Sequence, residues 1–304
     1  MFKMLGLSII LMITLTCVKL NAQIELKTEY LGASGFKNAD NVKTGGKGDA
    51  RVFSLSARIP LSLQVDENNK PVKAWGIALG GSYTSFSNHN IGPDFGPSKI
   101  ADANISLFNL RPISEKWSIL AMLGVGVYTG HTDLSRVGIS NMLGNGGVIF
   151  IWHIKKNLDA GLGPVINTLL GYPMIFPGVY VNWSTQGDYE VKVSMLDGLQ
   201  ASIGKRLSDH LKLNLVAEFD GSMALENSGG KKLMFTHQYF STGLQPQLKL
   251  AGALSISATA GISAGRAAYY QQRTLKSIFR GDDDVHNPHF GAAPYFSLSL
   301  KYGF

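Results

Sequence analysis

The sequence predicts an all-β fold, an antiparallel transmembrane β-barrel of about 14 strands, with 12 as the alternative count. Three observations predict it: apolar and polar residues alternate over long stretches, short polar turns alternate with long loops, and few charges accompany much apolar content. Of the 304 residues, 45% are hydrophobic, 16% are charged and 35 are glycine. This much apolar surface excludes a disordered chain, and a single cysteine excludes a disulfide scaffold.

The N-terminus has the pattern of a cleaved secretory signal. Lys3 supplies the positive charge, residues 5–16 form an apolar run shorter than a membrane span, and small Ala22 is the expected last residue before cleavage. A lipoprotein signal with Cys17 as the lipidated residue is the alternative, although Thr16 is a poor residue to precede it.

We therefore divide the chain into a signal peptide, residues 1–22, and one barrel domain, residues 23–304. Loss of Lys3 and Lys19 with the signal lowers the net charge from +7 to +5. No later apolar run approaches the roughly 20 residues of a spanning helix. The mature chain is then either a barrel in the cell outer membrane, which we expect, or a soluble exported β-protein.

The strands are predicted from a period of two, which places alternate side chains on opposite faces of a sheet. In 51–63, Phe53 and Leu55 share the apolar face while Ser54 and Arg58 lie on the other. In the last stretch Phe290 is expected on the apolar face with Phe296. The predicted strands are 24–34, 50–64, 73–87, 99–112, 117–130, 143–154, 158–168, 177–184, 188–195, 198–207, 210–221, 236–250, 252–266 and 288–303.

The connections between these strands alternate in length, which is typical of barrels with short periplasmic turns and long extracellular loops. The region 168–198 is interrupted by glycine and proline, and its loss as a hairpin gives the count of 12. The expected turns are 66–70, 114–116, 155–157, 185–188 and 208–210. The expected loops are about 35–49, 88–98, 131–142, 222–235 and 267–288.

The C-terminus ends in an amphipathic strand with a terminal aromatic residue. Leu300, Tyr302 and Phe304 resemble the signal that the barrel-assembly machinery reads, so we expect that machinery as a partner. Aromatic residues near other strand ends are consistent with interfacial girdles: Tyr30, Trp75, Tyr83, Trp117, Tyr128, Trp152 and Trp183.

Three strand–turn–strand corners carry a family resemblance: RPISEKWS at 111–118, FPGVYVNW at 176–183 and LSDHLKL at 207–213. With these corners the sequence resembles the uncharacterised outer-membrane β-barrel proteins common in Bacteroidota. The resemblance implies an architecture and a location, but no activity and no functional residues.

The predicted inward face carries charges of both signs. They form either a paired network that stabilises a narrow lumen or the polar wall of a selective pore. The lumen-facing candidates are Glu25, Lys27, Glu29, Arg58, His153, Asp159, Arg206, Lys212, Glu218, Asp220, Lys249 and Lys301.

The longest loop is the first candidate for binding an external partner, ligand or divalent cation. Asp282, Asp283, Asp284 and His286 place oxygen and nitrogen donors in one turn. The EF-hand pattern is absent, so a solvated acidic turn is the favoured interpretation, and no cofactor or metal site is predicted.

The sequence does not predict an enzyme. His237, with Tyr239 or Ser241 nearby, is the one place where a barrel enzyme is conceivable, but no G-x-S-x-G motif occurs. Basic residues are spread along the chain and are not clustered as in a nucleic-acid-binding surface, which excludes nucleic-acid binding. We expect external basic residues to meet outer-membrane lipid and lipopolysaccharide instead: Lys43, Lys47, Arg136, Lys231 and Lys232.

Passive or selective passage of small solutes is therefore the leading function predicted from the sequence. A structural or adhesion-type barrel with a closed lumen, acting through its external loops, is the alternative. The sequence does not identify a solute.

Overall fold

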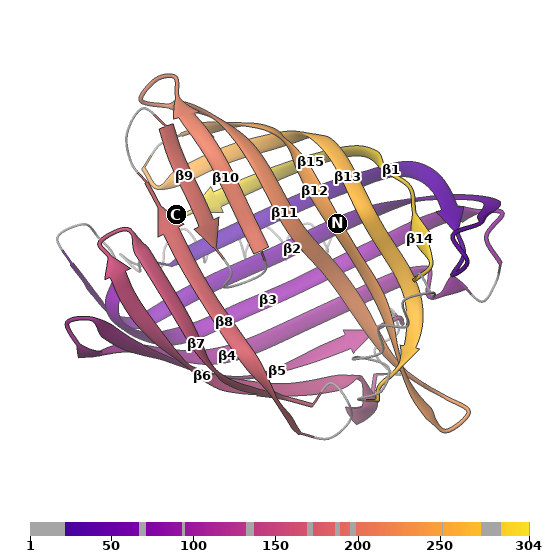
Figure 1. Ribbon diagram of the computed structural model, residues 1–304, viewed down its shortest axis with the longest axis horizontal. Coiled ribbons are helices and arrows are strands. Elements are labelled where there is room, and N and C mark those ends of the chain that lie inside the picture. The colour runs from indigo at the N-terminus through magenta and orange to yellow at the C-terminus, as the bar shows by residue number, and fades with distance from the viewer. Residues whose placement is uncertain are drawn as a thin grey trace, which may run out of the picture.

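The computed structural model describes residues 22–66, 71–92, 95–131, 137–168, 173–185, 189–194, 199–250, 252–274 and 287–303. These form one antiparallel sheet that closes on itself (Figure 1). The predicted signal peptide lies almost wholly outside the described residues, as do Arg136, Phe304, and the acidic turn with Asp282, Asp283, Asp284 and His286.

The strands follow the predicted order. The first half consists of β1 (Gln23–Lys37), β2 (Lys43–Val65), β3 (Pro71–His89), β4 (Lys99–Ser114), β5 (Trp117–Thr129), a 3₁₀ turn η3 (Ile139–Asn141), β6 (Met142–Lys155) and β7 (Leu158–Asn167). The second half consists of β8 (Met174–Ser184), β9 (Tyr189–Ser194), β10 (Leu199–Arg206), β11 (Leu211–Ser228), β12 (Lys231–Lys249), β13 (Leu254–Gln272), β14 (His289–Phe290) and β15 (Ala293–Tyr302).

The ring closes where β1 meets the last strand. β14 and β15 both pair with β13 on one side and with β1 on the other, so they are two segments of one strand. The 15 segments of the sheet therefore occupy 14 positions, all antiparallel, which confirms the predicted count. Residues 168–198 contain β8 and β9, so the 12-strand alternative is wrong.

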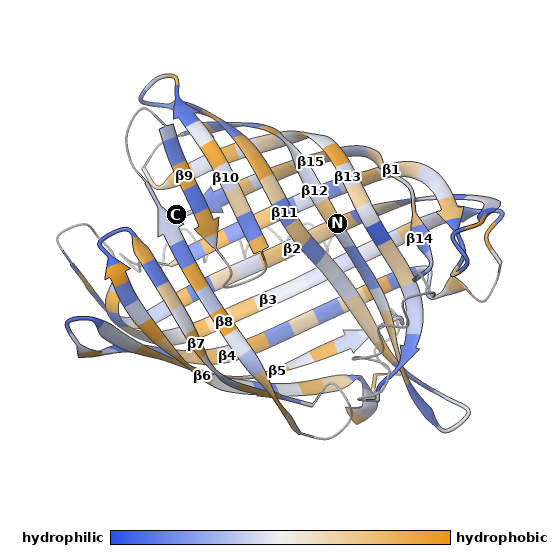
Figure 2. Cartoon of the chain, viewed as in Figure 1, coloured by the Kyte–Doolittle hydropathy of each residue, from blue (hydrophilic) through white to orange (hydrophobic). Residues whose placement is uncertain are grey.

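The exterior is apolar over a continuous belt, which is the property that a barrel needs to sit in lipid. Outward side chains keep large exposed fractions, including Leu123 at 68%, Leu162 at 62% and Ile175 at 67%. Figure 2 shows the alternation of apolar and polar positions along the strands. Among the described residues, no helix is long and apolar enough to cross a membrane.

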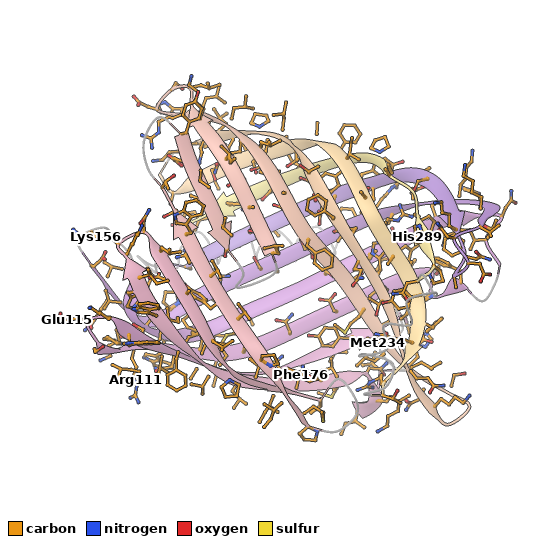
Figure 3. The ribbon with its side chains drawn as sticks, in the orientation of Figure 1. Arg111, Glu115, Lys156, Phe176, Met234 and His289 are labelled. Atoms are coloured by element: carbon orange, nitrogen blue, oxygen red, sulfur yellow. The ribbon has the colours of Figure 1, made fainter. Side chains whose placement is uncertain are left out.

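Charged and aromatic residues mark the two ends of the barrel. Figure 3 places Glu115 and Lys156 at the end with the short connections, the turn end, and His289 at the opposite, loop end. Near the turn end, the rings of Trp117 and Trp152 stack with centroids 6.0 Å apart. Trp75 and Trp183 are 47% and 37% exposed on the exterior, which is consistent with an interfacial girdle.

Two predicted long loops are wrong. The predicted loop 35–49 shortens to 38–42, because β1 extends to Lys37 and β2 begins at Lys43. Residues 222–235 are not a loop, because β11 and β12 stay paired up to Ser228 and Lys231. Gly229 and Gly230 join them with φ of 55° and 74°. Positive φ at both central residues is what a tight type I′ hairpin turn requires.

The prediction that Phe290 lies on the apolar outer face with Phe296 is also wrong. The last strand is interrupted between β14 and β15, and Phe290 turns inward, where it is 1% exposed. Opposite it, β13 carries an irregularity at Gly265, whose φ is 59°. The extra residue turns the neighbouring Arg266 into the barrel, where it is fully buried.

Candidate functional site: the barrel lumen

The interior has two unlike sides. We call the inward face of β1, of the loop-end halves of β2 and β3, and of β11–β15 the packed sector. The inward face of β4–β10 and of the turn-end halves of β2 and β3 is the open sector. In the packed sector large side chains fill the space, whereas glycine holds inward positions of the open sector at Gly126, Gly147, Gly163 and Gly178.

Aromatic rings close the packed sector toward the loop end. Phe95 lies 5.4 Å from Phe36, 5.7 Å from Phe235 and 5.7 Å from Phe290, measured between ring centroids. The guanidinium of Arg266 sits 3.8 Å from the centroid of the Phe290 ring. Arg266 also donates hydrogen bonds to the carbonyls of Gly32 and Gly48, at 3.3 and 3.0 Å.

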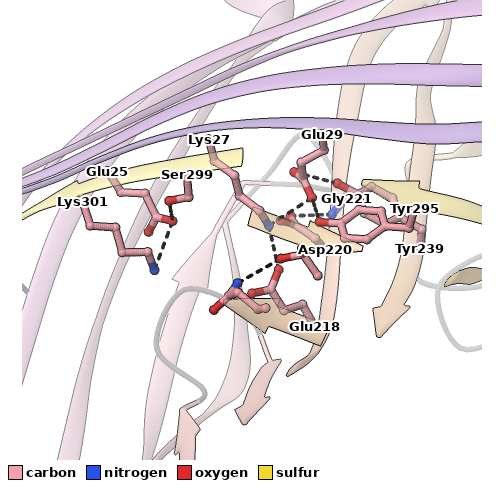
Figure 4. A network of polar contacts seen from close by, with 12 residues as sticks. Glu25, Lys27, Glu29, Glu218, Asp220, Gly221, Tyr239, Tyr295, Ser299 and Lys301 are labelled. Atoms are coloured by element: carbon pink, nitrogen blue, oxygen red, sulfur yellow. Dashed lines mark hydrogen bonds and ion pairs between the residues drawn. The ribbon is translucent and has the colours of Figure 1, made fainter. Parts of the chain in front are cut away.

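Below these rings, a charged network crosses the packed sector (Figure 4). Lys27 Nζ lies 2.6 Å from Glu218 Oε2 and 3.0 Å from Glu29 Oε1. Glu29, only 3% exposed, also accepts hydrogen bonds from the hydroxyls of Tyr239 and Tyr295. A buried carboxylate is tolerated only when it is paired and hydrogen-bonded in this way.

Three further ion pairs, one to Glu25 and two to Glu190, continue the polar wall toward the turn end. Lys301 Nζ lies 3.1 Å from Glu25 Oε1. Glu190 pairs with both Lys212 and Arg206, at 2.5 and 3.0 Å. These pairs join β15 to β1, and they join β9 to β10 and β11.

A third polar row spans β5, β6 and β7. Ser118 Oγ lies 2.8 Å from His153 Nε2, and His153 Nδ1 lies 2.7 Å from Asp159 Oδ1. This is the connectivity of a nucleophile, a base and an orienting acid. Ser118, however, is 2% exposed and lines neither interior cavity described below. A nucleophile must be reached by its substrate, so we interpret the row as a structural brace.

Two cavities occupy the open sector. One, of about 430 Å³, lies toward the turn end and reaches His153, Tyr180 and Ser194. The other, which we call the middle cavity, has about 440 Å³ and is lined by Asn104, Ile149 and other residues of β2 to β7. Both cavities share four lining residues: Arg58, Ala78, Leu120 and Met122. The shared lining places the two cavities next to each other in one lumen.

The structure places the predicted lumen residues in four separate groups. The packed-sector network holds Lys27, Glu29 and Glu218, with Asp220 nearby on β11, and Glu25 pairs separately with Lys301. Arg206 and Lys212 meet at Glu190, while His153 and Asp159 share the row with Ser118. Arg58 lies at the junction of the cavities, where its Nη1 donates a hydrogen bond of 3.4 Å to Gln23 Oε1. Lys249 is exposed at the turn end.

His237 is not an accessible catalytic base. It is fully buried, and its ring lies 4.9 Å from the ring of Phe86 in an edge contact. Neither ring nitrogen has a hydrogen-bond partner among the described residues. Within the same residues, no group of three His, Cys, Asp or Glu side chains is placed to hold a metal ion.

Sequence reasoning missed the aromatic closure and the row with Ser118. Phe95 and Ser118 carry no local signal, because their roles depend on partners far away in the chain. Glu190 has a weak signal, since it falls on the inward face of a predicted strand, the same face that carries Arg206 and Lys212 on the next two strands.

The chain belongs to a family described as a domain of unknown function, DUF6268, whose model matches residues 18–303. None of the curated proteins matches it. The predicted resemblance to barrel proteins without a known activity is consistent with this family.

Among solved structures, the chain is similar to the translocator domain of the autotransporter NalP from Neisseria meningitidis, with 12% identity, a TM-score of 0.37, and coverage of 99% of this chain and 95% of that one. It is similar to an outer-membrane channel from Pseudomonas putida F1, with 10% identity, a TM-score of 0.42 and coverage of 94% and 96%. It is similar to the Pseudomonas putida toluene transporter TodX, with 9% identity, a TM-score of 0.36 and coverage of 95% and 90%.

Proposed function

We propose that this protein is an outer-membrane channel that carries small solutes through its lumen. One observation carries the proposal: the two cavities of the open sector share Arg58, Ala78, Leu120 and Met122. Empty space therefore extends from the turn end to the middle of the barrel along one side. A barrel that served only as a scaffold has no need of an unfilled side when its other side is packed with rings.

The apolar exterior supports a location in the outer membrane, and we propose that the turn end faces the periplasm. Leu300 and Tyr302 point outward on β15, at 39% and 47% exposed, where the barrel-assembly machinery would read them together with Phe304. At the loop end Lys43, Lys47, Lys231 and Lys232 are exposed, in position to meet lipopolysaccharide phosphates. An origin in Bacteroidota is part of the same proposal.

Arg58 gives the proposed channel a selectivity. It is the one charged residue among the four that line both cavities. A cation that lines a lumen raises the local concentration of anions and repels cations. We expect a preference for anions in salt-gradient measurements on planar bilayers, and Arg58→Gln should shift the reversal potential toward zero.

Conductance with a plugged variant tests the channel itself. Ala78→Trp places an indole where the two cavities meet, so it should lower single-channel conductance at least fivefold. Ile77→Trp is the matched control, because its side chain lies on the lipid face of the same strand and should leave conductance unchanged. A folded wild-type barrel that conducts nothing would refute the proposal.

The aromatic closure favours one alternative, a structural barrel with a closed lumen that acts through its external loops. Rings from Phe36, Phe86, Phe95, Phe235 and Phe290 leave little room at the loop end of the packed sector. Loss of all conductance together with retention of a folded barrel is the result that would favour it.

A further inference from the structure

The barrel wall is interrupted between β8 and β11. β8 pairs with β9 only at Asn182, Trp183 and Ser184. On the other side, the pairing of β10 with β11 stops at Leu199 and Phe219. Among the described residues, no strand pairs with the free edge of β8 over 174–181 or with that of β11 over 220–228.

Figure 1 shows the same interruption. β9 and β10 are short and end well before the loop ends of β8 and β11, and the far wall is visible between these two strands. We call this interruption the lateral window, bounded by 174–181 of β8, 220–228 of β11, and the ends of β9 and β10.

β11 is held away from β8 by contacts across the barrel interior. Ser222 accepts a hydrogen bond of 3.1 Å from Thr84 on β3. Asn141 in η3 donates one of 2.6 Å to the carbonyl of Leu225. Leu225 also packs with Leu143 and Met234, and it is fully buried. The loop-end half of β11 is thus part of the closure, so the window is built into the packing.

The window borders the apolar exterior. Ile175 and Val179 on β8 are 67% and 49% exposed, and Phe219 below the window on β11 is 45% exposed. Unpaired strand edges are very costly in hydrocarbon, and irregular backbone at membrane depth is tolerated where it lines a cavity. The turn-end cavity lies behind the lower end of this edge, since Tyr180 lines it together with Asn182 and Ser194 of the paired segment just below.

The middle cavity, which adjoins the turn-end one, has mostly apolar walls. Leu120, Met122, Ile149 and Val165 line the middle cavity. Gly178 lies on the window edge of β8, and the side chains of Val165 and Ile149 pack directly against it. A Cβ at this position would lie 2.4 and 2.6 Å from their side-chain carbons. A passage lined in this way suits a molecule with an apolar body.

From this geometry we propose that small apolar molecules, aromatic or alkyl, pass between the lumen and the surrounding lipid through the lateral window. The inference rests on the proposed channel function and adds, beside the ion pathway past Arg58, an exit for uncharged apolar solutes. The solute moves between the turn end of the lumen and the surrounding lipid, by way of the cavity beside Met122 and the lateral window.

Photolabelling from the lipid tests the window. The full barrel, in a Cys17→Ser background, is placed in lipid nanodiscs with an apolar aryl-diazirine that partitions into lipid. Labelling is read by mass spectrometry at Met122 and Leu123, which point to the lumen and to the lipid from adjacent positions. Open access predicts strong labelling of both residues.

A covalent cross-link between the two edges of the window, which we call a staple, is the decisive test. Val179→Cys with Phe219→Cys, joined by a bismaleimide chosen for three strand spacings of about 14 Å, should lower labelling of Met122 at least fivefold and leave Leu123 unchanged. The matched control joins Val179→Cys to Leu162→Cys, its partner on β7. This staple spans unbroken wall and should leave Met122 labelled.

The outcomes separate the window from the channel. Equal labelling of Met122 with either staple, or none in the wild type, overturns the window even if bilayer conductance is normal. Cross-links between two copies of a single Val179→Cys variant would also overturn it, because another chain would then cover the edge. Loss of conductance in every preparation would refute the channel instead.

Discussion

The two sides of the barrel interior show opposite uses of the same strand pattern. In the packed sector, inward positions carry Phe, Tyr and paired charges, and side chains such as Phe235 and Leu31 have no exposed surface. In the open sector, inward positions carry glycine and small residues, and two cavities remain. Stability is therefore concentrated on one side, which leaves the other side free for passage.

The largest expected effect comes from removing a ring from the closure. Phe235 is fully buried, and its ring centroid lies 5.1 Å from that of Tyr270 and 5.7 Å from that of Phe95. Phe235→Ala should lower the free energy of unfolding by an amount at the upper end of about 3–5 kcal/mol. Urea unfolding in lipid vesicles, followed by tryptophan fluorescence, measures it.

The control for this variant lies in the open sector. Ile149 borders the middle cavity, so Ile149→Val removes a methyl group that is already partly unpacked. The expected loss is at the lower end of about 0.5–1.5 kcal/mol. If both substitutions cost the same relative to the volume removed, the two sectors are equally packed and the comparison fails.

The next effect comes from breaking the buried charge network. Lys27 is the cation between Glu29 and Glu218, and the side chains of Lys27 and Glu29 are 12% and 1% exposed. Lys27→Met leaves two carboxylates without their shared partner, so the barrel should lose about 3 kcal/mol. Equilibrium unfolding at neutral pH measures the loss.

Lys301→Met is the matched control, because Lys301 pairs with Glu25 at side-chain exposures of 29% and 20%. Water and salt screen such a pair, so its removal should cost at most about 1 kcal/mol. Equal losses for the two lysines would show that the network does not stabilise the packed sector more than the exposed pair does.

The sequence predicted the strands well because their signal is local. Alternation places Phe53 outward and Glu29 inward without any knowledge of the partner strands, and polar turns such as 114–116 and 208–210 mark the ends. The sheet order follows because antiparallel hairpins join neighbours in the chain.

The difference between the packed and open sectors could not be predicted from such local signals. Phe290 turns inward because β14 and β15 are separated by an irregular segment, and Arg266 follows because Gly265 adds one residue to β13. The meeting of Ser118 with His153 and Asp159 depends on the register of β5, β6 and β7. Register is set by pairing across the sheet, and no single strand encodes it.

The smallest expected effect belongs to the brace in the open sector. Ser118→Ala removes one hydrogen bond to His153, and the side chain of His153 is 28% exposed, so water replaces the lost partner. The expected loss is about 1 kcal/mol in the same unfolding measurement. A fluorophosphonate that reacts with activated serines should label the wild type no more than Ser118→Ala, because Ser118 is 2% exposed. Labelling that disappears in Ser118→Ala would instead make the row a catalytic site, and the open sector would then be an enzyme's pocket as well as a passage.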